Sequence, residues 1–129
     1  MNIVKILGSL VSVLQPWNWV KSFAKTQAKA IVTSEIDKLQ LEGEALIKKH
    51  GPGGVDLAFD ASQKRLQDAI DRLKWIPGFI KNMFKELISE QGDRFQAKAK
   101  LLVIEQGVDA YNQGVDGLQA ALLEKIERL

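Results

Sequence analysis

The feature that most constrains this chain is the spacing of its apolar residues, which follows a helical period in each segment between its proline and glycine breaks. The apolar rows advance in steps of three and four, as in Val32, Ile36 and Leu39. No stretch shows the sustained alternation of apolar and polar residues that is typical of an amphipathic strand. The sequence therefore predicts an all-α fold.

Breaks in this pattern divide the chain into the helices that we expect. The strongest is the run of glycine and proline at residues 51–54, where glycine permits a positive φ and proline cannot continue a helix. Weaker breaks stand at Pro16, at Pro77 and at Gly92. They predict an amphipathic helix over residues 1–15 and a helical bundle over residues 16–129, with helices at about 17–49, 56–76, 77–91 and 93–129.

The lengths of these segments predict an elongated antiparallel bundle. At 1.5 Å per residue, residues 17–49 would form a rod of roughly 50 Å, and residues 56–91, bent at Pro77, would form a rod of similar length. Residues 94–129 would form the third rod, after a reversal at Gly92. The alternative is an extended helical hairpin, in which the helix continues through Gly92 and other chains complete the core.

The last third of the chain carries the most regular apolar row. It begins at Ala97 and repeats every 3.5 residues, which is typical of a coiled-coil-like seam. Gly107 and Gly114 lie beside this row one heptad apart, which indicates either closely packed backbones or a locally weakened helix. The seam residues are Leu101, Ile104, Val108, Tyr111, Val115, Leu118 and Leu122.

The first 24 residues combine an apolar helix face with aromatic and basic residues. Every charged side chain before Glu35 is positive. An amphipathic helix of this kind suits a membrane interface with anionic headgroups, or it packs against protein. The expected anchor residues are Ile3, Ile6, Leu7, Leu10, Val11, Leu14, Trp17, Trp19 and Phe23, and the expected basic flank is Lys21, Lys25 and Lys29.

Two other interpretations of this segment fit less well. A transmembrane span needs about 20 predominantly apolar residues, whereas Pro16 and several polar residues interrupt this run. A secretory signal peptide needs a basic start and a small-residue cleavage motif, and neither is evident.

The amino-acid composition excludes several classes of metal site and catalytic site. The chain has no cysteine and one histidine, which excludes thiolate, iron–sulfur and multi-histidine metal sites and leaves only His50 for a nucleophilic triad. A net charge of +2, from 18 basic and 16 acidic residues, is too small to indicate nucleic-acid binding by itself. We therefore expect no enzyme activity, no catalytic residues, no metal and no cofactor.

These observations favour a non-catalytic helical structural or interaction protein. Its amino-terminal helix would dock on a membrane surface or in a larger assembly such as a virion, and its seam would contact protein subunits of its own kind or of that assembly. We expect it to be membrane-associated or held within an assembly. One alternative is a lipid-binding bundle that opens at Pro77. The other is a nucleic-acid-associated helical protein that contacts phosphates through Lys21, Lys25 and Lys29.

Overall fold

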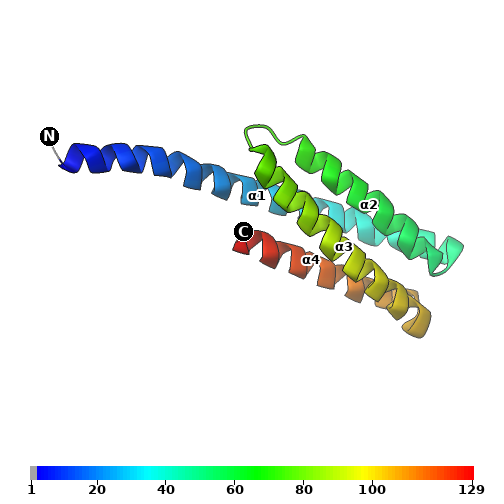
Figure 1. Cartoon of the computed structure of the whole chain (residues 1–129). Helices are drawn as coiled ribbons and strands as arrows, with labels where there is room; N and C mark the ends of the chain where they lie inside the picture. The colour runs from blue at the N-terminus through cyan, green and yellow to red at the C-terminus, as the bar shows by residue number, and fades with distance from the viewer. Residues whose placement is uncertain (1–2) are drawn as a thin grey trace.

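A computed structural model describes the backbone of residues 3–129 and the side chains of residues 19–129. Its elements are α1 (Ile3–His50), α2 (Gly53–Asp71), α3 (Gly78–Gln106), a 3₁₀ turn η1 (Val108–Ala110) and α4 (Tyr111–Arg128) (Figure 1). No strand occurs over the described backbone, so the all-α prediction is confirmed.

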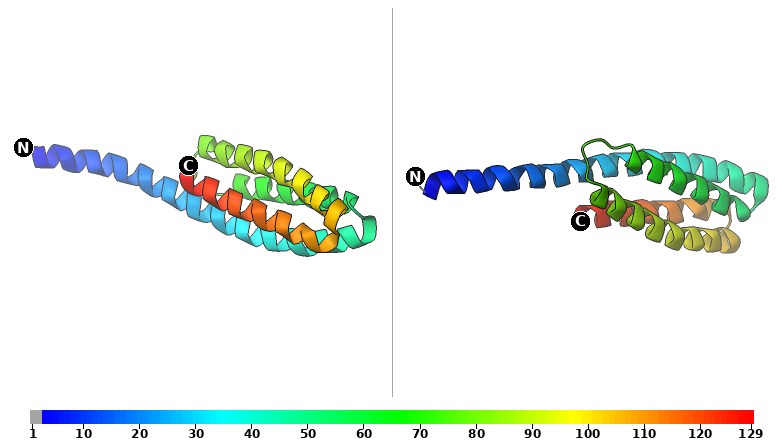
Figure 2. Two further views of the ribbon diagram at one scale, coloured as in Figure 1. Left: turned by 90° about the horizontal axis from the view of Figure 1, so that it is seen from below. Right: turned by 45° about the horizontal axis from the view of Figure 1, so that its top comes forward.

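Successive helices run antiparallel and pack as neighbours (Figure 2). The main contacts join α1 with α2, α2 with α3, α3 with α4 and α4 with α1, which leaves α1 and α3 diagonally opposite. The short connections after α1 and α3 lie together at one end of the bundle, which we call the turn end (Figure 1). The α2–α3 loop, residues 72–77, and the last residue, Leu129, lie at the opposite end, which we call the loop end. The chain therefore forms an elongated antiparallel bundle.

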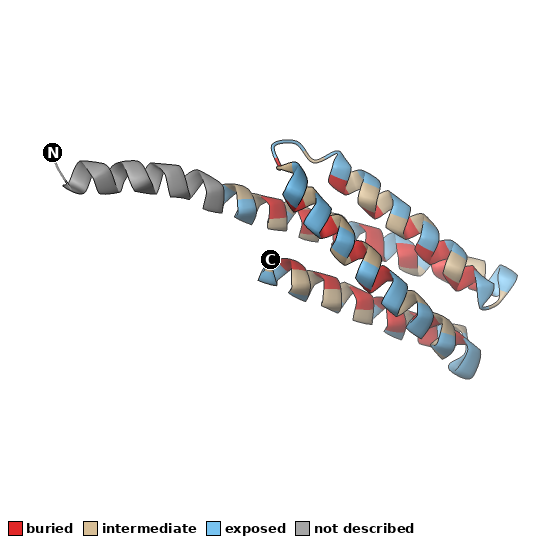
Figure 3. Cartoon of the chain, in the orientation of Figure 1, coloured by how far each residue is buried: buried red, intermediate tan, exposed pale blue. Residues whose placement is uncertain are grey.

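The core lies between the four helices, each of which turns a row of buried residues inward (Figure 3). The largest fully buried side chains include Tyr111, Phe59 and Phe84. Because burial of one aliphatic or aromatic side chain contributes roughly 1.5–3 kcal/mol, this interior is the main source of stability. The buried aliphatic residues include Val32, Ile36, Leu39, Leu66, Ile70, Ile88, Val115, Leu118, Leu122 and Ile126.

The helix boundaries in the second half differ from the prediction. The helices expected at 77–91 and 93–129 are replaced by α3, which continues through Gly92, and by α4, which follows a reversal at Gly107. Gly92 stays helical and packs against α2, where a Cβ on residue 92 would lie 2.6 Å from Gln63 Nε2. Gly107 adopts a φ of 92°, which favours glycine, and its N–H donates to the Val103 carbonyl at 2.9 Å. The reversal therefore occurs at Gly107 and not at Gly92.

Two proline positions were also interpreted wrongly. The bend expected at Pro77 is a loop that reverses the chain, because Pro77 has an extended ψ of 146° and α3 begins only after it. The break expected at Pro16 does not occur, since α1 is continuous from Ile3 to His50. What we expected as one bent rod over residues 56–91 is therefore part of an antiparallel hairpin.

The predicted seam is divided between two helices. Leu101 and Ile104 lie on α3 and are 54% and 60% exposed, and Val108 lies half-buried in η1. The chain reverses at Gly107, so the two halves of the row cannot share one helix face. The seam residues on α4 are buried, namely Tyr111, Val115, Leu118 and Leu122.

Gly114 packs as one of the two interpretations of the paired glycines expects. A Cβ at this position would lie 2.8 Å from the Cβ of Ala99. The backbones of α3 and α4 therefore approach closely here, whereas the other glycine of the pair, Gly107, forms the turn.

Tyr111 joins three helices at the centre of the turn-end half. It is fully buried, and its hydroxyl donates to the Leu39 carbonyl of α1 at 2.8 Å. Its ring meets the ring of Phe59 on α2 edge-on, with 6.3 Å between the centroids. The same ring lies against Gly43 of α1, where any Cβ would overlap it. α1 and α4 can approach this closely because residue 43 has no side chain.

Replacing Gly43 by alanine should lower the free energy of unfolding by about 1–3 kcal/mol, because the added Cβ would overpack a buried ring. Gly53→Ala is the matched control, since nothing lies within 4 Å of a Cβ at that position in the first turn of α2. Urea unfolding of both variants measures the difference. Equal unfolding free energies for the two variants would contradict the close approach of α1 and α4.

The buried hydroxyl of Tyr111 should make the fold sensitive to alkaline pH. Burial raises the pKa of Tyr111 far above its ordinary value, and the charges of Glu44 and Glu42 add to this shift. The folded protein therefore keeps a proton that the unfolded chain loses, so stability should fall as the pH rises through about 10.

Tyr111→Phe should weaken this alkaline loss, at a cost of about 1 kcal/mol at neutral pH for the missing hydrogen bond. Urea unfolding of the wild type and the variant at pH 7 and pH 11 provides the comparison. The lysines titrate in both proteins. The difference between the two alkaline losses of unfolding free energy therefore reports the contribution of the Tyr111 hydroxyl. An equal alkaline loss in the two proteins would show that Tyr111 is not responsible.

Candidate docking site at the loop end

Three aromatic side chains are exposed around the loop end of the bundle. Trp19 of α1 is 64% exposed, Trp75 of the α2–α3 loop is 86% exposed, and Phe79 in the first turn of α3 is 55% exposed. Trp75 also has a φ of 69°, a left-handed conformation that costs a residue other than glycine roughly 1–2 kcal/mol. A large apolar side chain that is both strained and exposed is a candidate for a contact outside the chain.

The predicted anchor residues are described only in part. Trp19 stacks on the half-buried Phe23, with 5.4 Å between ring centroids and 13° between planes, so Phe23 links the exposed indole to the bundle. The side chains of the remaining predicted anchors lie outside the described residues, namely Ile3, Ile6, Leu7, Leu10, Val11, Leu14 and Trp17.

The predicted basic flank contacts the end of α4. Lys25 Nζ donates to the Glu127 carbonyl at 2.8 Å, and Lys29 forms an ion pair with the Glu127 carboxylate. The hydrogen bond from Lys29 holds the pKa of that carboxyl below its usual range. Lys21 is exposed and has no ion pair with any residue whose side chain the structure describes. The three lysines therefore do not act as one uniform basic stripe.

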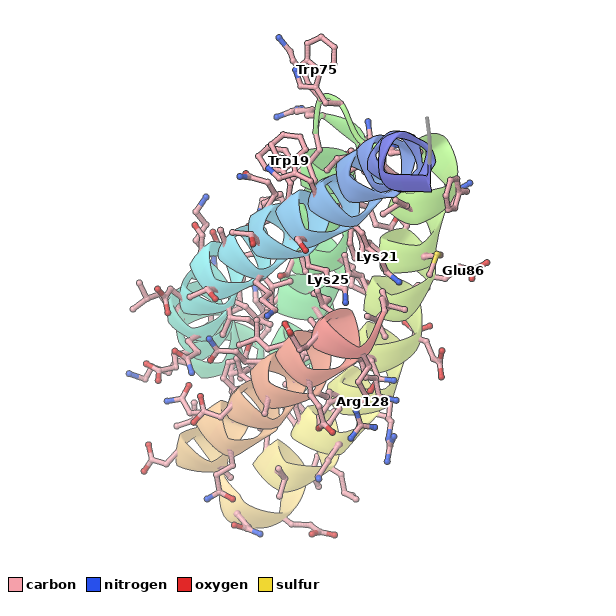
Figure 4. All side chains as sticks on the ribbon, turned by 90° about the vertical axis from the view of Figure 1, so that its left-hand side faces the viewer. Trp19, Lys21, Lys25, Trp75, Glu86 and Arg128 are labelled. Atoms are coloured by element: carbon pink, nitrogen blue, oxygen red, sulfur yellow. The ribbon has the colours of Figure 1, made fainter. Side chains whose placement is uncertain are left out.

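Two further cations stand in the α2–α3 loop. Arg72 and Lys74 are both exposed, and Lys74 directly precedes Trp75. In Figure 4, Trp75 and Trp19 lie on the side of α1 that faces this loop, whereas Lys21 and Lys25 point toward α3 and α4. The loop end thus presents aromatic rings and cations from separate segments of the chain.

A small cleft opens at the loop end between α1, the first turns of α3 and Leu129. The cleft has a volume of about 110 Å³. In Figure 4, Lys21 and Lys25 point into the space between α1, α3 and α4, and Glu86 points away from it. The cleft is lined by Lys21, Lys25, Phe79, Ile80, Met83, Phe84 and Leu129.

Neither a metal centre nor a membrane-spanning helix is found in the described part of the chain. No three histidine or carboxylate side chains described by the structure gather where they could hold a metal ion. No helix within the described residues combines the length and the apolar character needed to cross a bilayer.

Comparisons of the chain with protein-family models, with curated proteins and with solved structures find no significant match. What the loop end can do is therefore inferred from its residues and their surroundings.

Sequence reasoning missed Trp75, Phe79 and Met83 as parts of the loop end. A signal was present, because residues 79–88 contain six apolar side chains, which is more than one narrow helix face can bury. Ile80 and Phe84 are buried, whereas Phe79 and Met83 are exposed. Trp75 stands two residues before Pro77, where the helical pattern of the sequence is interrupted. Loop residues of this kind commonly lie on the surface.

Proposed function

We propose that this protein is a non-catalytic helical protein that docks the loop end of its bundle, together with its amino-terminal segment, on an anionic membrane surface. The observation that carries the proposal is the exposed and strained Trp75, which stands beside the exposed cations Arg72 and Lys74.

This combination matches the chemistry of a membrane interface. Tryptophan places an apolar ring at the headgroup level while its polar edge stays wet. Each lysine or arginine near an anionic surface adds about 1 kcal/mol of attraction, which salt screens. At the same end of the bundle, Trp19 would add a second interfacial ring and Lys21 would add electrostatic attraction. The amphipathic pattern of residues 1–15 would supply further apolar contact with the acyl region.

The described contacts favour this proposal over nucleic-acid binding. A stripe that binds successive phosphates needs several cations without carboxylate partners, but Lys29 is paired with the Glu127 carboxylate. The predicted basic flank therefore offers at most Lys21 and Lys25, which is too few for such a stripe.

Trp75→Gly should separate docking from folding. Glycine accepts the φ of 69° without strain, so the free energy of unfolding should stay the same or rise by up to about 1 kcal/mol. Binding to phosphatidylglycerol–phosphatidylcholine vesicles should weaken about tenfold, which corresponds to roughly 1.4 kcal/mol of lost ring burial. Vesicle flotation measures the affinity for the membrane, and urea unfolding measures the free energy of unfolding.

The matched control for this variant is Leu41→Ser. Leu41 is 74% exposed and lies on α1 toward the turn end, so its loss should leave vesicle binding unchanged. If Trp75→Gly binds vesicles as well as the wild type does, or if Leu41→Ser weakens binding equally, the loop end is not the docking surface.

A second candidate function is self-association through α3. Ala97, Leu101 and Ile104 are exposed and recur in steps of four and three, so they form an apolar row on one face of this helix. A second copy of the helix, packed against this row, would supply the partner that a 3.5-residue period is suited to meet.

Ile104→Glu should reduce self-association, because a carboxylate would then be buried in the contact. Sedimentation equilibrium over a range of protein concentrations measures the average mass. Leu41→Glu, on the diagonally opposite helix, is the control and should behave as the wild type does. A wild-type mass of one chain at every concentration would reject this second function.

A further inference from the structure

We infer that the loop-end cleft accommodates part of one acyl chain of an anionic membrane lipid, with the Lys21 and Lys25 ammonium groups facing its headgroup. This inference rests on the proposed membrane docking. It goes further, because docking by Trp75 and its neighbouring cations does not require any lipid to enter the bundle.

The walls of the cleft suit hydrocarbon. Ile80 and Phe84 are buried at 6% and 2% exposure and form its inner part, whereas Phe79 and Met83 are exposed. Apart from the two lysines, every side chain in the lining is aliphatic, aromatic or a thioether. A cavity lined in this way gives water few hydrogen-bond partners and favours an apolar occupant. Met83 adds a flexible side chain that can adjust to the shape of a chain.

The size of the cleft indicates where the occupant comes from. Its 110 Å³ is less than the roughly 150 Å³ of an apolar protein cavity that holds one benzene molecule. It can therefore enclose a few methylene groups and no complete lipid. The rest of the chain must remain over the exposed Phe79 and Met83 or in the bilayer. The geometry thus fits a lipid that still resides in a membrane better than a free fatty acid enclosed by the protein.

The charges at the cleft favour an anionic headgroup. Lys21 has no ion pair with any described residue, and Lys25 donates a hydrogen bond to the backbone carbonyl of Glu127 at 2.8 Å. The Glu127 carboxylate is held by Lys29, and Glu86 points away in Figure 4. No aspartate or glutamate occurs among the described lining residues. A phosphate group at the mouth of the cleft would therefore meet two cations, one of which, Lys25, also interacts electrostatically with the Glu127 carboxylate that Lys29 holds.

Methyl NMR of the full chain tests the inference directly. The probe is dihexanoyl phosphatidylglycerol below its critical micelle concentration, titrated into protein with labelled isoleucine and methionine methyl groups. The Ile80 and Met83 methyls should shift in a saturable way, and the Ile104 methyl near the turn end should not. Dihexanoyl phosphatidylcholine, with the same chains and no net charge, should bind at least threefold more weakly.

Two variants with matched controls locate the binding. Met83→Trp should fill the cleft and lower the affinity for the short-chain lipid about tenfold, whereas Leu41→Trp, exposed on α1 toward the turn end, should not. Lys21→Gln should remove much of the preference for phosphatidylglycerol, whereas Lys48→Gln, exposed on α1 near the turn end, should keep it. Lys21→Gln replaces an exposed side chain and leaves the core unchanged, so it tests the site even if Met83→Trp does not fold.

Flotation with phosphatidylglycerol-containing vesicles, measured in parallel, separates the two proposals. Vesicle binding without a saturable shift at Ile80 and Met83 would overturn the cleft inference and leave membrane docking standing. A saturable shift without vesicle binding would overturn both the membrane source of the lipid and the docking proposal. Equal affinity in Met83→Trp and Leu41→Trp, or an undiminished preference in Lys21→Gln, would show that the lipid binds elsewhere.

Discussion

The structure depends most on the contact between Tyr111 and Gly43. A full-sized aromatic ring lies against the backbone of α1 because residue 43 has no side chain, and the ring hydroxyl bonds to the Leu39 carbonyl. Phe59 packs edge-on against the same ring, so one side chain joins α1, α2 and α4. Tyr111 is also the first residue of α4, so this contact lies where the last helix of the bundle begins.

The loop end of the bundle differs in character from this closely packed region. Four residues of α3, namely Phe79, Ile80, Met83 and Phe84, line a cleft there together with Leu129 and two lysines of α1. Ile80 and Phe84 are buried, whereas Phe79 and Met83 are exposed. The bundle is thus closely packed around Tyr111 and has an apolar cleft at its loop end.

Polar contacts between helices support this register without supplying much stability. Arg65 of α2 donates to Glu35 and Glu42 of α1, and Lys100 of α3 pairs with Asp56 of α2. Most of these groups are partly exposed, and surface ion pairs contribute about 0–1 kcal/mol each. These ion pairs instead favour one alignment of the helices, because each joins two residues that meet only when neighbouring helices are in the correct register.

The amino-acid sequence by itself determined that the chain is helical and that it reverses after His50. These properties are local, since apolar spacing and a glycine–proline run act over a few residues. Only the tertiary structure decided that Gly92 continues a helix while Gly107 ends one, and that Trp75, Phe79 and Met83 join Trp19 and Lys21 at the loop end. A glycine can occupy a helix or a left-handed turn at similar cost, so the choice depends on what packs against it, which is Gln63 for Gly92 and nothing within 4 Å for Gly107.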